Sequence, residues 1–254
     1  MFVDGDDALT EKAVENLLTR MDADADIICC CCNAFSEEGM QADHFFEGDL
    51  RMETEKEKER LFLQLMDPGY GKIKTSTAIG VPWGKIYRTS LIKDGKLRFN
   101  PALRRMQDNI FNMHVFARAG VIQYVNEPWY LYRLDHISTV RFKYAPEIWK
   151  EILRERDSFY EARPDLVTEE VRRFRYLEKN TAMLASVAYI AGRREGREGV
   201  REIKSLMDSG VFADVIREWR AYYRPVRFLA VRTLLKLRRY GLTLALMKVY
   251  LKRT

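Results

Sequence analysis

The chain has 254 residues, of which 47% are hydrophobic, so it is large enough to form one large or two smaller domains with a real core. No apolar run approaches the length of a membrane span, and the N-terminus shows no basic region followed by an apolar one. We therefore expect neither a transmembrane helix nor a signal peptide, and we expect the protein in the cytoplasm or at the inner face of the cell membrane.

The basic charge is concentrated at one end of the chain. Residues 221–254 contain nine Lys or Arg and no Asp or Glu, whereas the first 220 residues contain 34 basic and 37 acidic residues. The sequence pI of about 9.1 therefore reflects the tail. It gives no indication that the main body binds nucleic acid, and no nucleic-acid partner is expected.

The first residues place carboxylates directly after a short apolar pair. Phe2 and Val3 are followed by Asp4, Asp6 and Asp7, as at the end of a strand that runs into a loop. In open α/β sheets, ligands bind outside the carboxyl ends of strands. Carboxylates on a loop there suit a hard divalent cation bound to phosphate oxygens. The alternative interpretation is an ordinary Asp-Gly turn.

Three elements are predicted next along the chain. Thr10 is expected to cap a helix whose apolar positions are Ala13, Val14, Leu17 and Leu18. Residues 27–32 form an apolar run, typical of a buried strand, that contains all four cysteines in succession. Neighbouring side chains on a strand point to opposite faces, so these thiols cannot converge on one metal and are expected to be reduced core residues. Residues 53–66 are predicted to form a helix with a solvated Glu/Lys face.

Residues 81–139 contain a series of aromatic and polar motifs. Apolar residues recur at helical spacing after Asp108, which places this carboxylate near a helix N-terminus. A lone carboxylate there is usually a cap or compensates the helix dipole. Residues 121–125 and 129–134 are predicted as two strands joined by 126–128. In order, the motifs comprise Trp83, Lys85, Tyr87 and Arg88; Phe99 and Leu103; Asp108, Phe111 and Asn112; Asn126, Glu127, Pro128, Tyr130, Tyr132 and Arg133; and Ser138.

The remainder of the chain is predicted to be helical. Apolar residues recur every three or four positions over residues 148–163, 169–191, 199–207 and 211–222. The tail, residues 225–254, mixes apolar and basic residues in an imperfect amphipathic pattern. Attachment to anionic lipid and plain packing against other helices or a second subunit are both open for the tail.

The five motifs between residues 81 and 139 resemble, in order and spacing, the second half of the bacterial family 2 glycosyltransferases, which have the GT-A fold. This resemblance implies an α/β fold over residues 1–144, namely a partial GT-A (Rossmann-like) mixed sheet with flanking helices. An α-helical appendage with a basic tail would follow over residues 145–254. The family's nucleotide-binding half does not precede Met1, so we expect a chain that begins inside such an enzyme.

The resemblance also implies roles for particular residues. Asp4-Gly5-Asp6 matches the family's Asp-x-Asp signature, in which the first Asp contacts the sugar nucleotide and the second helps to hold Mg²⁺ or Mn²⁺ on its diphosphate. Asp108 corresponds to the catalytic base. Trp83 and Lys85 are expected to shape the donor and acceptor pocket, with a purely structural core position as the alternative for Trp83.

A third metal ligand is less well defined by the resemblance. The family commonly places a His three residues after the tyrosine of its Tyr-Arg pair. Alignment on Tyr132 and Ser138 puts Asp135 at that position and His136 one residue later. Either side chain is a suitable ligand, since Asp also binds hard cations.

The implied function is transfer of a sugar, with inversion, from a nucleotide-sugar donor to a hydroxyl acceptor. A UDP-sugar is the first choice of donor, and a saccharide or lipid-linked acceptor in surface polysaccharide or glycolipid synthesis is the expected context. An alternative of a different class is a non-catalytic remnant or accessory module that binds a membrane or a partner through its basic tail.

Overall fold

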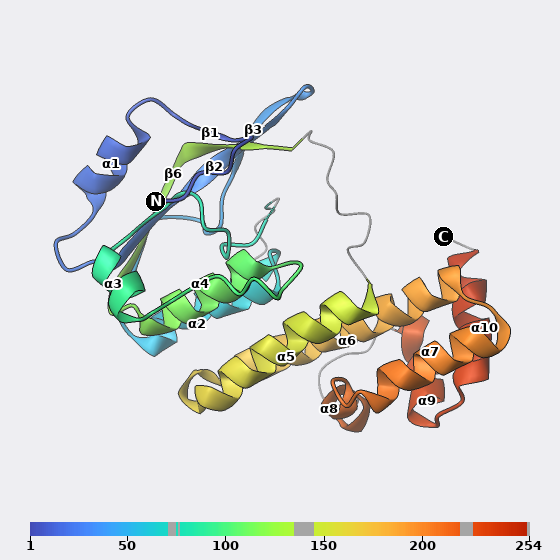
Figure 1. Ribbon diagram of the computed structural model, residues 1–254. Coiled ribbons are helices and arrows are strands. Elements are labelled where there is room, and N and C mark those ends of the chain that lie inside the picture. Colours follow the sequence, from blue (N-terminus) through green and yellow to red (C-terminus); the bar gives the residue numbers. More distant parts are fainter. Residues whose placement is uncertain (71–74, 76, 135–144, 219–225, 253–254) are drawn as a thin grey trace. The chain divides into compact units, whose positions relative to one another are not determined.

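The computed structural model describes residues 1–70, 75, 77–134, 145–218 and 226–252 (Figure 1). The chain divides into two compact units, Met1–Ser138 and Thr139–Thr254. The first contains a mixed sheet with flanking helices, and the second is helical where it is described. This confirms the fold class expected from the sequence, a mixed α/β unit followed by helices.

Two long parallel strands form the centre of the sheet, β2 (Ile27–Ser36) and β6 (Ile122–Arg133). β6 also pairs with β4 (Leu50–Met52) near its start and with β1 (Ala8–Leu9) near its end. β2 pairs with β5 (Lys85–Tyr87) near its start and with β3 (Gly39–Asp43) near its end. These four short strands are antiparallel to their partners, so the described residues form a six-stranded mixed sheet.

The prediction of two strands joined at residues 126–128 was wrong, because β6 is a single strand with an irregularity at that point. Its register against β2 shifts between Cys30 and Cys32. Asn126 holds the irregular segment: its Oδ1 accepts from the Tyr124 hydroxyl at 2.9 Å, and its Nδ2 donates to the Glu47 carbonyl at 3.2 Å. Residues 126–129 of β6 therefore lie opposite the single residue Cys31 of β2, as in a β-bulge with several extra residues.

Helices cover both faces of the sheet. α2 (Glu55–Met66) and α4 (Gln107–Arg118) lie side by side on one face, and α1 (Ala13–Arg20) lies on the other (Figure 1). α3 (Thr89–Asp94) packs against α4. α2 begins with a capping box, in which the Thr54 hydroxyl accepts from the Glu57 amide and the Glu57 carboxylate accepts from the Thr54 amide.

α1 differs from its prediction at its start and on its face. Thr10 does not cap it, because the Thr10 hydroxyl donates to the Trp129 carbonyl at 3.2 Å and the helix instead follows Lys12 in a left-handed conformation. Leu17 is buried, whereas Leu18 is 56% exposed and Val14 is 42% exposed. The apolar face that packs on the sheet is therefore narrower than the periodicity predicted.

In the second unit, helices pack around α6, and the core includes residues from α5 to α10. Arg156 and Glu178 form a buried ion pair there, with Nη1 and Oε1 2.8 Å apart. No described helix is both long enough and apolar enough to cross a membrane. The elements are α5 (Pro146–Ala162), η3 (Pro164–Leu166), α6 (Glu169–Arg193), α7 (Gly196–Asp208), α8 (Ala213–Arg217), α9 (Val226–Lys236) and α10 (Tyr240–Leu251).

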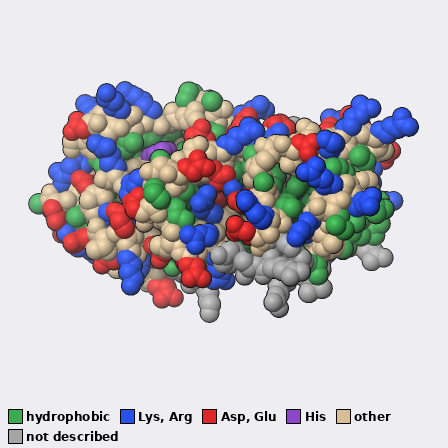
Figure 2. Space-filling model, turned by 90° about the horizontal axis from the view of Figure 1, so that it is seen from below, with side chains coloured by type: hydrophobic (Ala, Val, Ile, Leu, Met, Phe, Trp, Pro, Cys, Tyr) green, Lys and Arg blue, Asp and Glu red, His purple; other side chains and the backbone are tan. Residues whose placement is uncertain are grey.

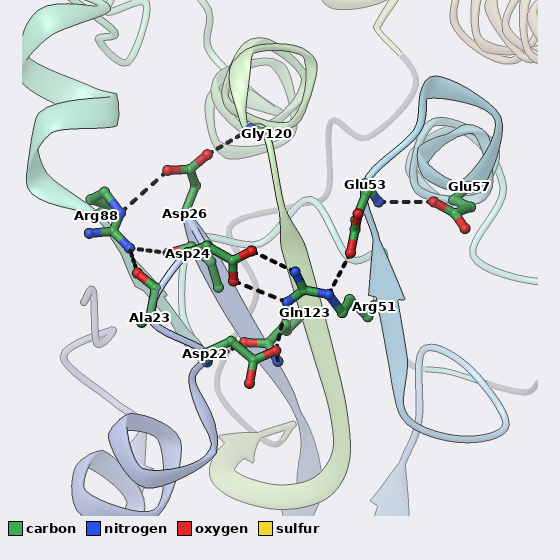
Figure 3. Close-up of polar contacts among 11 residues, drawn as sticks. Asp22, Ala23, Asp24, Asp26, Arg51, Glu53, Glu57, Arg88, Gly120 and Gln123 are labelled. Carbon is green, nitrogen blue, oxygen red and sulfur yellow. Dashed lines mark hydrogen bonds and ion pairs between the residues drawn. The ribbon is translucent and has the colours of Figure 1, made fainter.

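A polar network ties together the starts of β2 and β6 and the adjacent β4 (Figure 3). Arg51 on β4 donates to Asp22 at 2.6 Å, to Asp24 at 2.7 Å and to Glu53 at 2.6 Å. The Gln123 amide, at the start of β6, donates to Asp22 at 2.7 Å. These contacts fix the amino ends of the two central strands.

The cysteines behave as the sequence predicted. All four are free and buried on β2. Burial raises the pKa of Cys29 to about 11 and that of Cys30 to about 12. A thiol with a raised pKa carries little thiolate, which is the reactive form.

We therefore predict that the native protein does not react with Ellman's reagent at pH 8 over minutes. All four thiols should react once the chain is unfolded in guanidinium, which serves as the positive control. Rapid modification of even one thiol in the native state would contradict the buried position of β2.

Candidate functional site

The acidic loop, defined here as residues 4–7, lies beside the carboxyl end of β6. The Tyr130 hydroxyl donates to Asp7 Oδ2 at 2.7 Å and accepts from the Asp4 amide at 3.1 Å. The Arg133 amide donates to Asp7 Oδ1 at 2.9 Å, and Arg133 Nε donates to the Asp6 carbonyl at 3.0 Å. The loop is thus fixed at the sheet edge where α/β proteins bind ligands, with Asp4 and Asp6 exposed.

Tyr130 is itself held by an aromatic stack. Its ring lies 4.3 Å from the Trp83 ring with an interplanar angle of 4°, and the Tyr132 ring lies 5.1 Å from Trp83. Phe2, just before the acidic loop, forms a parallel bridge with Trp83. Trp83 is 1% exposed. It therefore occupies a core position, the alternative to a role in the pocket that the sequence left open.

Lys85 lies two residues after Trp83, at the first position of β5, and is fully buried. Its Nζ donates to the Val81 carbonyl at 2.7 Å and to the Trp83 carbonyl at 3.3 Å. Burial lowers the pKa of Lys85, and the charge of Asp108 acts in the opposite direction. Lys85 therefore fixes the backbone around Trp83 and adds a positive group near Asp108.

Asp108 lies in the first turn of α4, which starts after Met106 in a left-handed conformation (φ 57°). Since α4 leads directly into β6, the N-terminus of the helix faces the carboxyl-end side of that strand (Figure 1). One Asp108 oxygen, Oδ1, accepts from the Asn109 amide at 2.7 Å. In this position the negative charge of Asp108 also compensates the positive end of the helix dipole.

The environment of Asp108 suits a proton acceptor. Burial raises the pKa of Asp108, while the Asn109 amide, Lys85 and Arg105 act to lower it. A carboxylate whose pKa is raised by burial is a candidate general base, because a pKa closer to the working pH makes it a better proton acceptor.

An aromatic cluster joins the acidic loop to α4. The Phe2 ring packs edge-on against Tyr87 at 5.8 Å, Phe99 at 5.6 Å and Phe111 at 6.1 Å. Phe111 is three residues after Asp108 on α4, and its ring stacks on Phe99 at 4.2 Å. Asp4 follows Phe2 by two residues, so the acidic loop and the start of α4 belong to one connected region.

Three other residues of the 81–139 motifs, Tyr87, Arg88 and Asn112, form hydrogen bonds that connect neighbouring elements of the fold. The Tyr87 hydroxyl donates to Asn112 Oδ1 at 2.8 Å, and Asn112 Nδ2 donates to the Gly80 carbonyl at 2.8 Å. Arg88 donates to the carbonyls of Ala23 and Ala25 at the opposite end of the sheet (Figure 3). These contacts join β5, α4 and the start of β2 without reaching the acidic loop.

The most specific contact of the site, between Tyr130 and Asp7, could not be predicted from the sequence. Tyr130 was identified only as one of the 81–139 motif residues and Asp7 only as a carboxylate next to Asp4 and Asp6, yet the two side chains together anchor the loop. The signal in the sequence is a third carboxylate directly after the signature. Its partner could not be identified, because the two residues are 123 positions apart.

Asp4 and Asp6 could bind a divalent cation, but the described protein side chains alone do not complete its coordination shell. Among the described residues, no group of three or more His, Cys, Asp or Glu side chains could hold a metal. Mg²⁺ is commonly bound by one or two carboxylates together with substrate phosphates, and the exposed Asp4 and Asp6 provide such a pair. Asp135 and His136, the expected third ligands, lie outside the described residues, as does Ser138.

No family model matches the chain. Over 154 residues the chain is 26% identical to "Putative glycosyltransferase EpsH" of Bacillus subtilis (strain 168), a match that covers 59% of this chain and 41% of EpsH. The chain therefore aligns with less than half of that relative's length.

The fold is similar to that of TarS from S. aureus. The crystal structure of TarS 1–349 in complex with UDP-GlcNAc matches all of this chain and 68% of that chain, with a TM-score of 0.54 and 14% identity. A second crystal structure of TarS 1–349 matches all of this chain and 66% of that chain, with a TM-score of 0.50 and 16% identity. The chain is thus glycosyltransferase-like in sequence and in fold.

We predict that ¹³C NMR of aspartate carboxyls shows Asp108 titrating above the ordinary value of 3.8. Lys85→Met should raise the pKa of Asp108 further, because it removes a neighbouring positive group. Asp165 serves as the internal control, since Arg163 lowers its pKa. A pKa of Asp108 at or below that of Asp165 would show that this carboxyl is not in a desolvated environment.

Proposed function

We propose that this protein is an inverting glycosyltransferase of the family 2 type, which moves a sugar from a nucleotide-sugar to a hydroxyl acceptor. The observation that carries the proposal is the joining of an anchored acidic loop, through Phe2, to the helix that bears the partly buried carboxylate of Asp108. The similarity to EpsH in sequence and to TarS in fold supports the same class of reaction.

Asp108 is proposed as the general base. Inverting transfer needs a group that takes the proton of the acceptor hydroxyl as its oxygen attacks the sugar C1. Burial raises the pKa of Asp108, whereas its place in the first turn of α4 and the neighbouring Lys85 favour the ionised form. The carboxylate therefore acts only after it has lost its proton, so activity should increase with pH through the pKa of Asp108.

Asp4 and Asp6 are proposed to hold Mg²⁺ or Mn²⁺ together with the donor diphosphate, and Asp135 or His136 to complete the ligand set. When bound, the cation would neutralise the charge that develops on the leaving diphosphate. The chain's own contribution is to hold the two carboxylates in place, which the Asp7 and Tyr130 side chains do through their hydrogen bond.

Trp83 and Lys85 are proposed to act behind the donor pocket. Trp83 supports the ring of Tyr130 by stacking, and Lys85 supports the backbone of Trp83 through two carbonyl bonds. Both side chains are enclosed by protein, so we assign them positioning roles that fix the acidic loop and balance the charge of Asp108.

A UDP-sugar is proposed as the donor, because the structurally similar TarS was crystallised with UDP-GlcNAc. A saccharide or lipid-linked acceptor in surface polysaccharide or glycolipid synthesis is proposed as the acceptor. The comparisons do not favour the alternative of a non-catalytic accessory module. Because this chain covers 41% of EpsH, tests of activity should use the protein expressed from its complete reading frame.

We predict that Asp108→Asn lowers kcat for transfer from UDP-sugars by about a thousandfold with a nearly unchanged KM for the donor, since a lost general base typically costs this much. The variant should remain folded, because it replaces a partly buried carboxyl, whose charged form is disfavoured, with a neutral amide of the same shape. Asp94→Asn, an exposed acid on α3, is the matched control and should keep full activity. Asp108→Asn with more than about a tenth of the wild-type kcat would remove Asp108 from this role.

We predict that Asp4→Asn/Asp6→Asn abolishes UDP-dependent binding of Mn²⁺, measured by the electron paramagnetic resonance signal of free Mn²⁺. Tyr130→Phe keeps the aromatic stack but removes the hydroxyl that orients the loop, so it should weaken Mn²⁺ binding by about tenfold. Asp94→Asn should bind as the wild type does. Unchanged Mn²⁺ affinity in the double variant would show that the acidic loop is only a turn.

A further inference from the structure

An open groove lies between α7 and α10 in the helical unit. Its volume is about 650 Å³, and its floor is apolar, with Val200 from α7 and Leu244 and Ala245 from α10. The two helices approach closely at Gly199, where a Cβ atom would lie 2.9 Å from a Leu244 methyl group. The groove is therefore a feature of the helix packing itself.

Three basic side chains line the groove beside these apolar residues. Arg197 and Arg201 occupy successive turns of α7, and Lys248 reaches the groove from α10. Within the part of the chain that the structure describes, the side chains of Arg197 and Arg201 form no hydrogen bond or ion pair. Lys248 has one long contact, 3.3 Å, with the exposed Glu195. The positive charge along the groove is thus only weakly compensated.

The outer face of α10 continues the apolar surface next to the groove. Leu242 is 60% exposed and Val249 is 45% exposed, and with Ala245 they recur at three- and four-residue spacing on one side of the helix. Residues 221–254 contain no Asp or Glu. In Figure 2, hydrophobic side chains of the helical unit are likewise exposed between Lys and Arg side chains.

We propose that the α7–α10 groove and the outer face of α10 bind the surface of a membrane that contains anionic phospholipid. A lipid phosphate would lie against Arg197, Arg201 and Lys248, and the side chains of Leu242 and Val249 would enter the boundary between headgroups and acyl chains. An apolar helix face beside several cations is the surface that favours such interfacial binding.

Two other occupants fit these observations less well. A nucleic acid would match the positive charge, but the exposed side chains between the cations are aliphatic, whereas single-stranded binding surfaces use aromatic rings to stack on bases. A second copy of the chain, paired symmetrically through this face, would bring the same cations together and be opposed by like-charge repulsion.

Lipid binding is separable from sugar transfer, because the groove lies in the helical unit and the acidic loop in the sheet-containing unit. The test is co-sedimentation of the full chain with vesicles of phosphatidylcholine alone or with about a third phosphatidylglycerol, at increasing salt. We expect binding only to the anionic vesicles and weaker binding at higher salt.

Arg197→Glu/Arg201→Glu should weaken binding to the anionic vesicles by about tenfold or more, because each reversal removes an attractive charge and adds a repulsive one. Leu242→Asp/Val249→Asp should have a similar effect through the apolar face. Arg154→Glu/Arg172→Glu is the control, since it changes the net charge equally at exposed positions of α5 and α6. Circular dichroism and melting curves confirm that each variant is folded.

Equal binding to both kinds of vesicle, no binding to either, or an equal loss in the control variant would overturn the proposal. Sedimentation velocity is measured in parallel. Self-association that Arg197→Glu/Arg201→Glu abolishes, in a chain that does not bind vesicles, would make the groove an interface between copies and would also overturn it.

Discussion

The hydrogen bond from the Tyr130 hydroxyl to Asp7 is the contact on which the proposed site depends. It joins the second strand of the central pair to a loop from the start of the chain, and the same hydroxyl accepts the Asp4 amide. Trp83 stacks on the Tyr130 ring, so the hydroxyl is held rigidly. The carboxylates of Asp4, Asp6 and Asp7 repel one another. Asp7 is held by hydrogen bonds to Tyr130 and Arg133, whereas Asp4 and Asp6 are exposed.

The two ends of the central strands have different tasks. At the amino ends, Arg51 and Arg88 neutralise acidic residues and bind carbonyl groups, so the acids there are engaged in holding strands together (Figure 3). At the carboxyl ends, the acidic loop and the start of α4 are joined by the rings around Phe2. Charge at the first end is compensated within the protein, whereas the second end suits a phosphate-bound cation.

Much of this architecture follows from local sequence patterns. The apolar run at 27–32 predicted the central strand and its buried thiols, and the helical spacing after Asp108 predicted α4. Local patterns failed where distant contacts form. The Thr10 hydroxyl donates to the Trp129 carbonyl instead of capping α1, and at 126–128, inside the single strand β6, Asn126 Nδ2 donates to the Glu47 carbonyl. The anchoring of Asp7 was missed for the same reason. The roles of Asp4, Asp6 and Asp108 came from resemblance to a family, since carboxylates in turns and helix starts are common without it.

Asp4, Asp6 and Asp108 are proposed to surround one donor site. The most direct measurement is an anomalous difference map at the manganese absorption edge, from crystals of the full-length protein grown with UDP and Mn²⁺. We expect one strong peak between the carboxylates of Asp4 and Asp6, with the UDP diphosphate beside the manganese and the Asp108 carboxylate lining the same cavity. A manganese peak away from the acidic loop, or packed side chains separating Asp108 from the diphosphate, would contradict it.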